Sequence, residues 1–318
     1  MTKLSFGFCS FAVLMLGASN LAIGSGLTAT TDPLTRYCHI QYQVPPEIPN
    51  EVTVMCSWSP AAENRWRPAR IRPFISETAM RLASAEQWQQ WTKLGSIIER
   101  NAAGLIRTVV FDPYPQAQND GKVNIDFRIR LESPDGKLLA EYTKRIKADN
   151  SDVAYLEDWT CMFQKEAVST KPQEHRAQWH WRTDIDASSG ASYGNDLYGF
   201  AGRDNALPQL SYPLDLKGQY AIFVKAGSVK LRLTGDERAD RLSSEHGWPT
   251  LWRWTAMDRQ HLVIKQPHAY TGWAPASIDY VKLVPLSEQL VTELDSQFGG
   301  TPDKFIAGYW EPYSWAFH

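Results

Sequence analysis

The sequence predicts a mainly β protein with two β-sandwich modules of jelly-roll type, the first of which also contains one helix. Short runs of alternating apolar and polar residues recur along the chain and are separated by turn-forming residues, which is typical of antiparallel sheets. The clearest run is Val123–Leu131, where the alternation is unbroken. The length of 318 residues accommodates about two domains of roughly 150 residues each. Aromatic residues make up 12% of the chain, including 13 Trp, and such side chains favour strands.

The charge balance argues against one class of partner. The chain has 33 Lys and Arg against 35 Asp and Glu, which gives a formal net charge of −2. Proteins that bind nucleic acid through its phosphates usually carry a surplus of basic residues. We therefore expect no nucleic-acid partner.

Residues 1–24 are predicted to form a secretory signal peptide. A short basic start at Met1–Lys3 is followed by a mostly apolar run at Leu4–Leu16, which is too short to span a bilayer. Small residues allow cleavage after Ser19 or after Gly24. We expect a secreted or periplasmic protein that has no membrane association after cleavage.

Export makes the cysteines informative, because disulfides form in oxidising compartments. The mature chain keeps Cys38, Cys56 and Cys161, which allow one bridge in three ways. Cys38 and Cys56 lie on consecutive strand-like runs, so we predict a disulfide between them. We expect Cys161 to be a small buried residue.

The first module is expected at residues 37–165. Ser84 and Gln87 have the spacing of a capping box, and the apolar residues that follow share one helical face as far as a stop at Gly104. Ser133–Gly136 has the composition of a hairpin turn. The residues expected on the helical face are Trp88, Trp91, Leu94, Ile97 and Ile98. The expected strands are 38–44, 52–58, 69–75, 105–111, 122–132 and 137–147.

The second module is expected at residues 173–286, with a long loop at 186–205. Residues 287–318 are expected to form a helix, at 287–298, and then the first strand of a truncated further domain. The alternative for that last strand is that it adds to an existing sheet. The expected strands of the second module are 178–183, 219–226, 228–234, 261–266 and 277–284.

Two strands of this module carry a family resemblance. Leu216–Val224, with its Gly218-Gln219-Tyr220 sequence, and Ile278–Leu283 resemble the corresponding strands of galactose-binding-like carbohydrate-binding modules. The resemblance covers about 110 residues and implies a jelly roll, a polysaccharide or oligosaccharide partner and a structural calcium for which Asp279 is a candidate ligand. The tail Phe305–Trp315 looks like the opening strand of a (β/α)₈ glycoside hydrolase.

The candidate ligand-binding residues are aromatic and polar residues at predicted turns. Sugar rings present apolar C–H faces and hydroxyl rims, so they bind flat aromatic side chains beside hydrogen-bonding groups. Trp252 and Trp254 alternate on one strand face, and we assign them to the core. The candidates are Trp248, Tyr270, Trp273 and His268.

A second calcium candidate lies in the predicted loop. Asp184, Asp186 and Ser188 place oxygen ligands at every second position, as calcium loops do. The alternative is an ordinary turn stabilised by aspartate side chains, and the sequence favours it because the glycine is one position late.

Four arginines cluster in the first module. Arg65, Arg67, Arg70 and Arg72 surround Trp66 and Pro68. We favour a solvated strand edge, where charges prevent edge-to-edge association. The alternative is a patch that binds acidic glycans through bidentate contacts.

Catalysis by this chain alone is not expected. Glycoside hydrolysis needs two carboxylates about 5–10 Å apart, and the tail supplies one candidate, Glu311. The sequence therefore predicts the non-catalytic, polysaccharide-binding N-terminal region of a secreted glycoside hydrolase-like protein. The alternative is a complete, free-standing secreted carbohydrate-binding or structural exoprotein.

Overall fold

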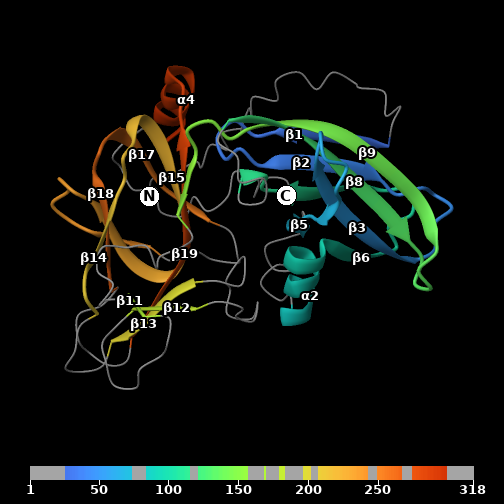
Figure 1. Cartoon of the computed structure of the whole chain (residues 1–318), viewed down its shortest axis with the longest axis horizontal. Coiled ribbons are helices and arrows are strands. Elements are labelled where there is room, and N and C mark those ends of the chain that lie inside the picture. Colours follow the sequence, from blue (N-terminus) through green and yellow to red (C-terminus); the bar gives the residue numbers. More distant parts are fainter. Residues whose placement is uncertain are drawn as a thin grey trace, which may run out of the picture.

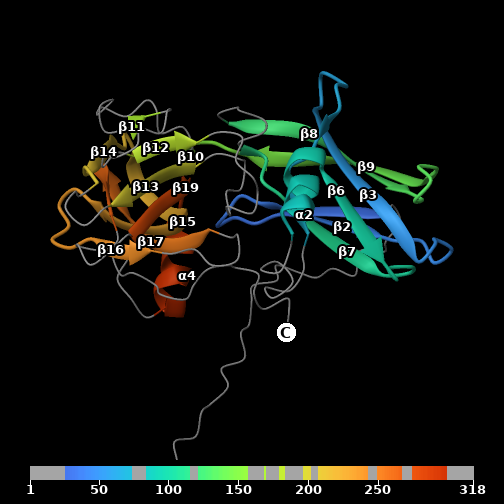
Figure 2. The ribbon, with the colours of Figure 1, turned by 90° about the horizontal axis from the view of Figure 1, so that it is seen from below.

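The computed structural model is built from antiparallel sheets in two sandwich-like parts that lie side by side (Figures 1 and 2). The predicted mainly β, sandwich-type fold is confirmed. Within the described residues no helix has the length and apolar composition needed to cross a bilayer. The structure describes residues 26–73, 84–114, 121–156, 168–169, 179–182, 196–201, 207–242, 249–266 and 274–298. The predicted signal peptide, residues 1–24, lies outside these ranges.

The first sandwich consists of a four-stranded and a five-stranded sheet that share one apolar core. Phe111 and Phe127 come from opposite sheets, and their ring centroids lie 5.1 Å apart. Alternate residues of each central strand point into this core, as the sequence pattern predicts. The first sheet has the order β1 (Leu27–Thr31), β2 (Cys38–Gln43), β7 (Ile106–Phe111) and β5 (Ile71–Pro73). The second contains β4 (Arg67–Pro68), β3 (Glu51–Pro60), β8 (Lys122–Glu132) and β9 (Leu138–Asp149), with β6 (Ser96–Arg100) also on β3.

The helix begins where the sequence predicts but ends earlier. Ser84 caps α2 (Ala85–Gln89), and the Ser84–Gln87 capping box is present. A π-helical turn, η1 (Gln90–Leu94), follows and stops at Gly95, which has a φ of 61°. The predicted continuation to Gly104 is wrong, because Ile97 lies on strand β6.

The predicted hairpin at Ser133–Gly136 is confirmed. The amide of Ser133 donates to the carbonyl of Lys137 at 2.9 Å, and the amide of Gly136 donates to the carbonyl of Ser133 at 2.8 Å. Strands β8 and β9 pair along their length on either side of this turn.

The predicted Cys38–Cys56 disulfide is not formed, and both thiols are free and buried. Cys38 lies on β2 in one sheet, whereas Cys56 lies on β3 in the other. The two runs are consecutive in the sequence but do not pair. Burial raises the pKa of the Cys38 thiol to about 11 and that of Cys56 further above its usual range. Cys161 lies outside the described residues.

The second sandwich is organised around one long strand, β15 (Lys217–Leu233). Its first part pairs with β17 (Thr250–Asp258) and β19 (Ala274–Pro285), and its last part pairs with β16 (Asp240–Leu242) and β18 (His261–Lys265). The register shifts between these parts, at Lys225–Ser228. A Cβ atom at Gly227 would lie within 2.2 Å of Ser277 Oγ, so β19 approaches β15 closely at this point. The predicted strands 219–226 and 228–234 are therefore one bent strand.

The remaining strands extend the same sheet. β13 (Asp196–Ala201) falls within the predicted loop 186–205 and pairs with β19, so that loop prediction is partly wrong. β10 (Ala154–Leu156), from the segment assigned to the first module, also pairs with β19. The other strands are β11 (Val168–Ser169), β12 (Trp179–Arg182) and β14 (Leu210–Pro213).

A bulge places the two core tryptophans on opposite faces of the sheet. Arg253 pairs with Ile222 and Leu251 pairs with Phe223, which leaves Trp252 as the extra residue. Trp252 therefore packs in the interior of the sandwich, whereas Trp254 packs beneath α4 (Glu288–Phe298). Both rings are fully buried, so their assignment to the core is confirmed.

The two sandwiches meet through buried polar side chains. Lys282 Nζ on β19 donates to Asp112 Oδ1 at 3.0 Å, and its amine lies 4.3 Å from the centre of the Tyr37 ring. The Tyr280 hydroxyl on β19 also lies 3.4 Å from the hydroxyl of Tyr37 in the first sandwich. Burial lowers the pKa of the Lys282 amine, an effect that Asp112 opposes.

Candidate functional site

Most of the predicted site residues lie outside the described residues. This holds for the four ligand-binding candidates Trp248, Tyr270, Trp273 and His268, for the calcium candidates Asp184, Asp186 and Ser188, and for Glu311. The structure does describe the strands that lead into the segments containing the ligand-binding candidates. Residues 243–249, with Trp248, connect β16 to β17. Residues 266–273, with His268, Tyr270 and Trp273, connect β18 to β19.

The ends of these strands meet at one short stretch of β15, Val224–Lys230, which we call the β15 bend. Leu242, the last residue of β16, pairs with Val229, and Lys265, the last residue of β18, pairs with Lys230. β16 and β18 are both antiparallel to β15, so their carboxyl ends lie at the same end of the sheet. Neighbouring strands are about 4.8 Å apart, so the two ends are separated by about 10 Å.

The returning strands begin at the same place. Thr250, the first residue of β17, pairs with Val224. On β19, Ser277 pairs with Ser228, three residues after the strand begins. The seven residues of the β15 bend span about 20 Å or less at about 3.3 Å per residue. Both segments with aromatic candidates thus start and end against one small part of the sheet.

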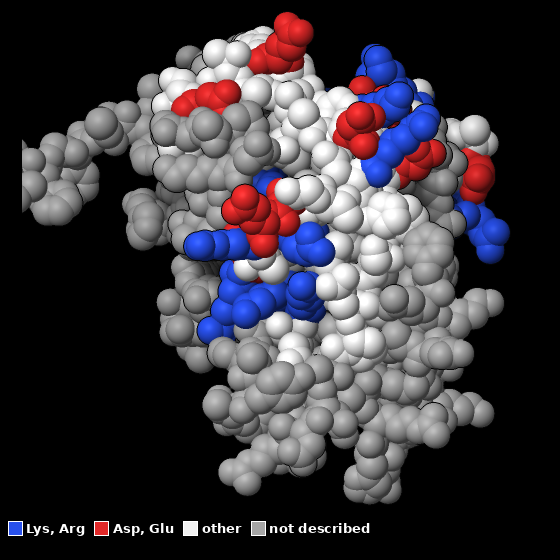
Figure 3. Space-filling model, turned by 90° about the vertical axis from the view of Figure 1, so that its left-hand side faces the viewer, with Lys and Arg blue, Asp and Glu red and all other residues white. Residues whose placement is uncertain are grey.

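Three basic residues lie side by side next to the β15 bend. Lys230 is the register partner of Arg241 on β16 and of Lys265 on β18, so three like charges form a row across adjacent strands. We call these three residues the basic stripe. Directly opposed like charges destabilise a sheet. None of the three has an ion pair with a carboxylate among the described residues. Figure 3 shows basic side chains gathered around acidic ones on this side of the molecule.

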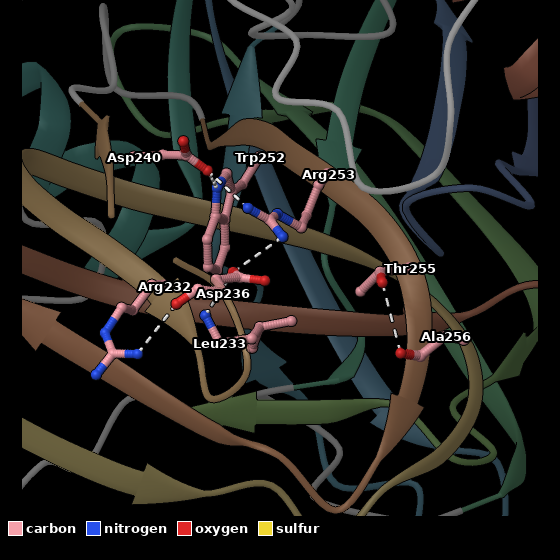
Figure 4. A network of polar contacts seen from close by, with 8 residues as sticks. All are labelled: Arg232, Leu233, Asp236, Asp240, Trp252, Arg253, Thr255 and Ala256. Atoms are coloured by element: carbon pink, nitrogen blue, oxygen red, sulfur yellow. Dashed lines mark hydrogen bonds and ion pairs between the residues drawn. The ribbon is translucent and has the colours of Figure 1, made fainter. Parts of the chain in front are cut away.

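The acidic side chains beside the stripe are engaged by a buried arginine (Figure 4). Arg253 Nη1 donates to Asp236 Oδ2 at 3.1 Å, and Arg253 Nη2 donates to Asp240 Oδ2 at 2.7 Å. Trp252 Nε1 donates to the same Asp240 oxygen at 2.8 Å, and the guanidinium lies 4.6 Å from the Trp252 ring centre. The side chain of Arg253 is only 6% exposed, so these two carboxylates compensate a buried charge. They are therefore not free to neutralise the basic stripe.

Asp279 is the one predicted calcium ligand within the described residues, and it lies beside a lysine. Asp279 Oδ2 lies 3.4 Å from Lys225 Nζ, and both side chains are buried. An ion pair thus occupies the carboxylate that the resemblance suggested as a ligand. In the described part of the chain, no group of three or more His, Cys, Asp and Glu side chains could hold a metal ion.

Two arginines of the cluster in the first module, Arg67 and Arg72, are engaged within the fold. Arg67 pairs with Glu63 at 3.4 Å and lies over the Trp58 ring at 5.2 Å. Arg72 is buried on β5. These contacts fit the strand-edge interpretation better than the alternative of a glycan-binding patch.

The basic stripe was missed by sequence reasoning. Its three residues are separated by 11 and 24 positions in the chain and lie on three different strands. They come together only because β15 pairs with a strand on each side. Nothing in the sequence specifies the register that aligns these three residues.

Comparison with known proteins does not assign the chain to a family. No protein-family model matches the chain, and no curated protein matches it. Among solved structures, a mutant of CfaE, the CFA/I adhesin of enterotoxigenic E. coli, aligns with 82% of this chain and 74% of its own at 11% identity. The TM-score of that alignment is 0.16, so it assigns neither fold nor function to the chain.

Proposed function

We propose that this chain is a non-catalytic polysaccharide-binding protein, the N-terminal region of a secreted glycoside hydrolase-like protein. The observation that carries the proposal is the convergence of two segments on the β15 bend. The register pairs Leu242–Val229 and Lys265–Lys230 place the carboxyl ends of β16 and β18 at the same end of the sheet. The segments that leave these ends contain Trp248, His268, Tyr270 and Trp273.

The chemistry of these residue types suits a sugar. Indole and phenol rings stack on the apolar faces of pyranose rings, while imidazole and hydroxyl groups bond to the hydroxyl rims. More than one aromatic candidate favours a chain of sugars over a single one as the ligand. The resemblance of Leu216–Val224 and Ile278–Leu283 to carbohydrate-binding modules supports the same ligand class.

The test is retention of the mature protein on insoluble and gel-embedded polysaccharides. We expect Trp273→Ala and Trp248→Ala to weaken retention at least about fivefold, because each removes one stacking platform. Trp66→Ala is the matched control, since Trp66 belongs to the first sandwich beneath Arg128 and should leave retention unchanged. Circular dichroism melting confirms that each variant is folded. Equal retention of all variants, or no retention of the wild type on any glycan, would overturn the proposal.

Two further parts of the proposal have their own measurements. Export predicts that the protein recovered from outside the cytoplasm begins after Ser19 or Gly24, and an intact Met1 there would contradict it. Association with a hydrolase predicts that coding sequence for a (β/α)₈ domain continues beyond His318. A stop codon at that point would favour the free-standing exoprotein.

A further inference from the structure

The basic stripe of Lys230, Arg241 and Lys265 indicates the charge of the ligand. We propose that the polysaccharide bound at the β15 bend is anionic and that its carboxylate or sulfate groups lie across this stripe. This inference rests on the proposed polysaccharide-binding function and narrows it to one chemical class.

The first argument is the register. Lys230 stands directly opposite both other residues, so three cations lie within about 10 Å on one face of three adjacent strands. Side chains in such positions have Cβ atoms only about 5 Å apart, where like charges repel. An anion lying across the row would contact all three cations and remove their repulsion. Because the cations follow one another across the strands, the site suits an extended polyanion better than a single small anion.

The second argument is the state of the neighbouring charges. The segments around the stripe are β16, β18, residues Val229–Leu233 of β15, and the turn that joins β15 to β16. They contain three acidic residues, namely Asp236, Glu237 and Asp240. Arg253 engages the two aspartates. Among these described residues, Glu237 is thus the one remaining carboxylate beside five basic residues. These are Lys230, Arg232, Arg238, Arg241 and Lys265.

The third argument is position. Lys265 is the last residue of β18, and Arg241 is the next-to-last residue of β16. The segments with Trp248 and with Trp273 therefore begin within two residues of a stripe cation. The proposed ligand would present carboxylate or sulfate groups to the row. Arginine and lysine are suited to such groups, because their N–H donors form charge-assisted hydrogen bonds with carboxylate and sulfate.

A nucleic acid is a poorer match to this surface. A duplex-binding protein commonly makes 6–10 phosphate contacts, whereas the stripe offers three cations in a chain of net charge −2. The anionic polysaccharide is the occupant that fits both the small cation count and the aromatic segments.

The test compares four soluble probes by affinity electrophoresis of the mature full-length protein. The probes are polygalacturonate, dextran sulfate, uncharged dextran and double-stranded DNA. The variant is Lys230→Gln with Arg241→Gln and Lys265→Gln. The control is Lys137→Gln with Lys144→Gln and Lys147→Gln, which removes the same charge from exposed positions of the first sandwich.

We expect the wild type and the control to bind at least one of the two anionic polysaccharides at least about tenfold more tightly than dextran. We expect the stripe variant to lose that preference. The slope of log affinity against log salt should fall by about 1 for each cation removed. Polygalacturonate and dextran sulfate together tell whether carboxylate or sulfate is preferred.

The other outcomes are distinct. Trp273-dependent binding of uncharged glycans that is unchanged in the stripe variant would overturn this inference and leave the proposed function standing. Absence of binding to every polysaccharide would overturn both. Tighter binding of DNA than of either anionic polysaccharide, with loss in the stripe variant, would replace the polysaccharide by a nucleic acid.

Discussion

Lys282 on β19 and Asp112, which follows β7, form a buried ion pair of 3.0 Å that joins the two sandwiches. The lysine side chain is fully buried, and the aspartate side chain is 7% exposed. A buried charge that loses its partner is strongly destabilising, whereas a buried pair replaced as a whole by apolar residues is often tolerated.

The first prediction follows from this pair. We expect Lys282→Met to lower the free energy of unfolding by about 3–5 kcal/mol, because the buried Asp112 carboxylate would lose its ion pair with Lys282. The double variant Lys282→Met with Asp112→Leu should recover most of that loss. Urea denaturation followed by tryptophan fluorescence measures both. Arg145→Ala, which breaks an exposed pair with Asp126, is the control and should cost at most about 1 kcal/mol. A double variant as unstable as the single one would contradict a buried ion pair between Lys282 and Asp112.

The second prediction concerns Asp240, which accepts hydrogen bonds from Trp252 and Arg253. We expect Asp240→Ala to destabilise the protein by about 2–4 kcal/mol, because a buried guanidinium and an indole N–H lose a shared acceptor. Asp215→Ala removes an aspartate from an exposed pair with Arg259 and should cost at most about 1 kcal/mol. Equal melting temperatures of the two variants would be incompatible with the network in Figure 4.

The third prediction concerns the end of the helical segment. A Cβ atom at Gly95 would lie 2.5 Å from the Cys56 carbonyl oxygen and 2.6 Å from that of Ala69. Because these are backbone atoms at a residue with positive φ, we expect Gly95→Ala to cost about 2–5 kcal/mol. Gly104 also has positive φ but has open space around it, so Gly104→Ala should cost only about 1–2 kcal/mol. Comparable urea midpoints for the two variants would contradict the tight packing at Gly95.

The fourth prediction concerns the free thiols. We expect Cys38 and Cys56 to resist iodoacetamide at pH 8 in the folded protein, because buried protonated thiols are poor nucleophiles. Both should react after unfolding in urea without any reductant. Peptide mass mapping reads the outcome. If the thiols reacted only after reduction, the Cys38–Cys56 disulfide predicted from the sequence would be present after all.

The Cys38 thiol also predicts a dependence of stability on pH. Its pKa is raised from 9.0 to about 11, mainly by burial. Between these values the unfolded chain has lost the proton that the folded chain still holds, so the stability that Cys38 contributes falls as the pH rises from 9 to 11. Urea midpoints across this range should fall less steeply for Cys38→Ala than for the wild type. Parallel profiles would contradict a buried thiol at this position.

Sequence patterns predicted the elements that local rules determine. Strand 122–132 and its turn were correct because alternation and turn chemistry are both contained within a few residues. The capping box gave the helix start, but the apolar spacing that continued to Ile98 came from a strand after Gly95. The strand at Asp196–Ala201 was missed because glycine and polar residues in that stretch indicate a loop, and pairing with β19 overrides them.

Non-local pairing explains the remaining differences. Cys38 and Cys56 are close in sequence, yet their strands belong to opposite sheets. Trp252 and Trp254 follow a regular alternation in the sequence, but a bulge turns them to opposite faces. The basic stripe depends on the register of three strands, which no single segment of the sequence encodes.

The most direct test is hydrogen exchange of the mature protein with and without a polysaccharide that it retains. We expect added protection in peptides covering 224–230, 241–250 and 265–277, and unchanged exchange in the first sandwich. Protection confined to the first sandwich, or no change anywhere at saturating polysaccharide, would contradict binding at the β15 bend.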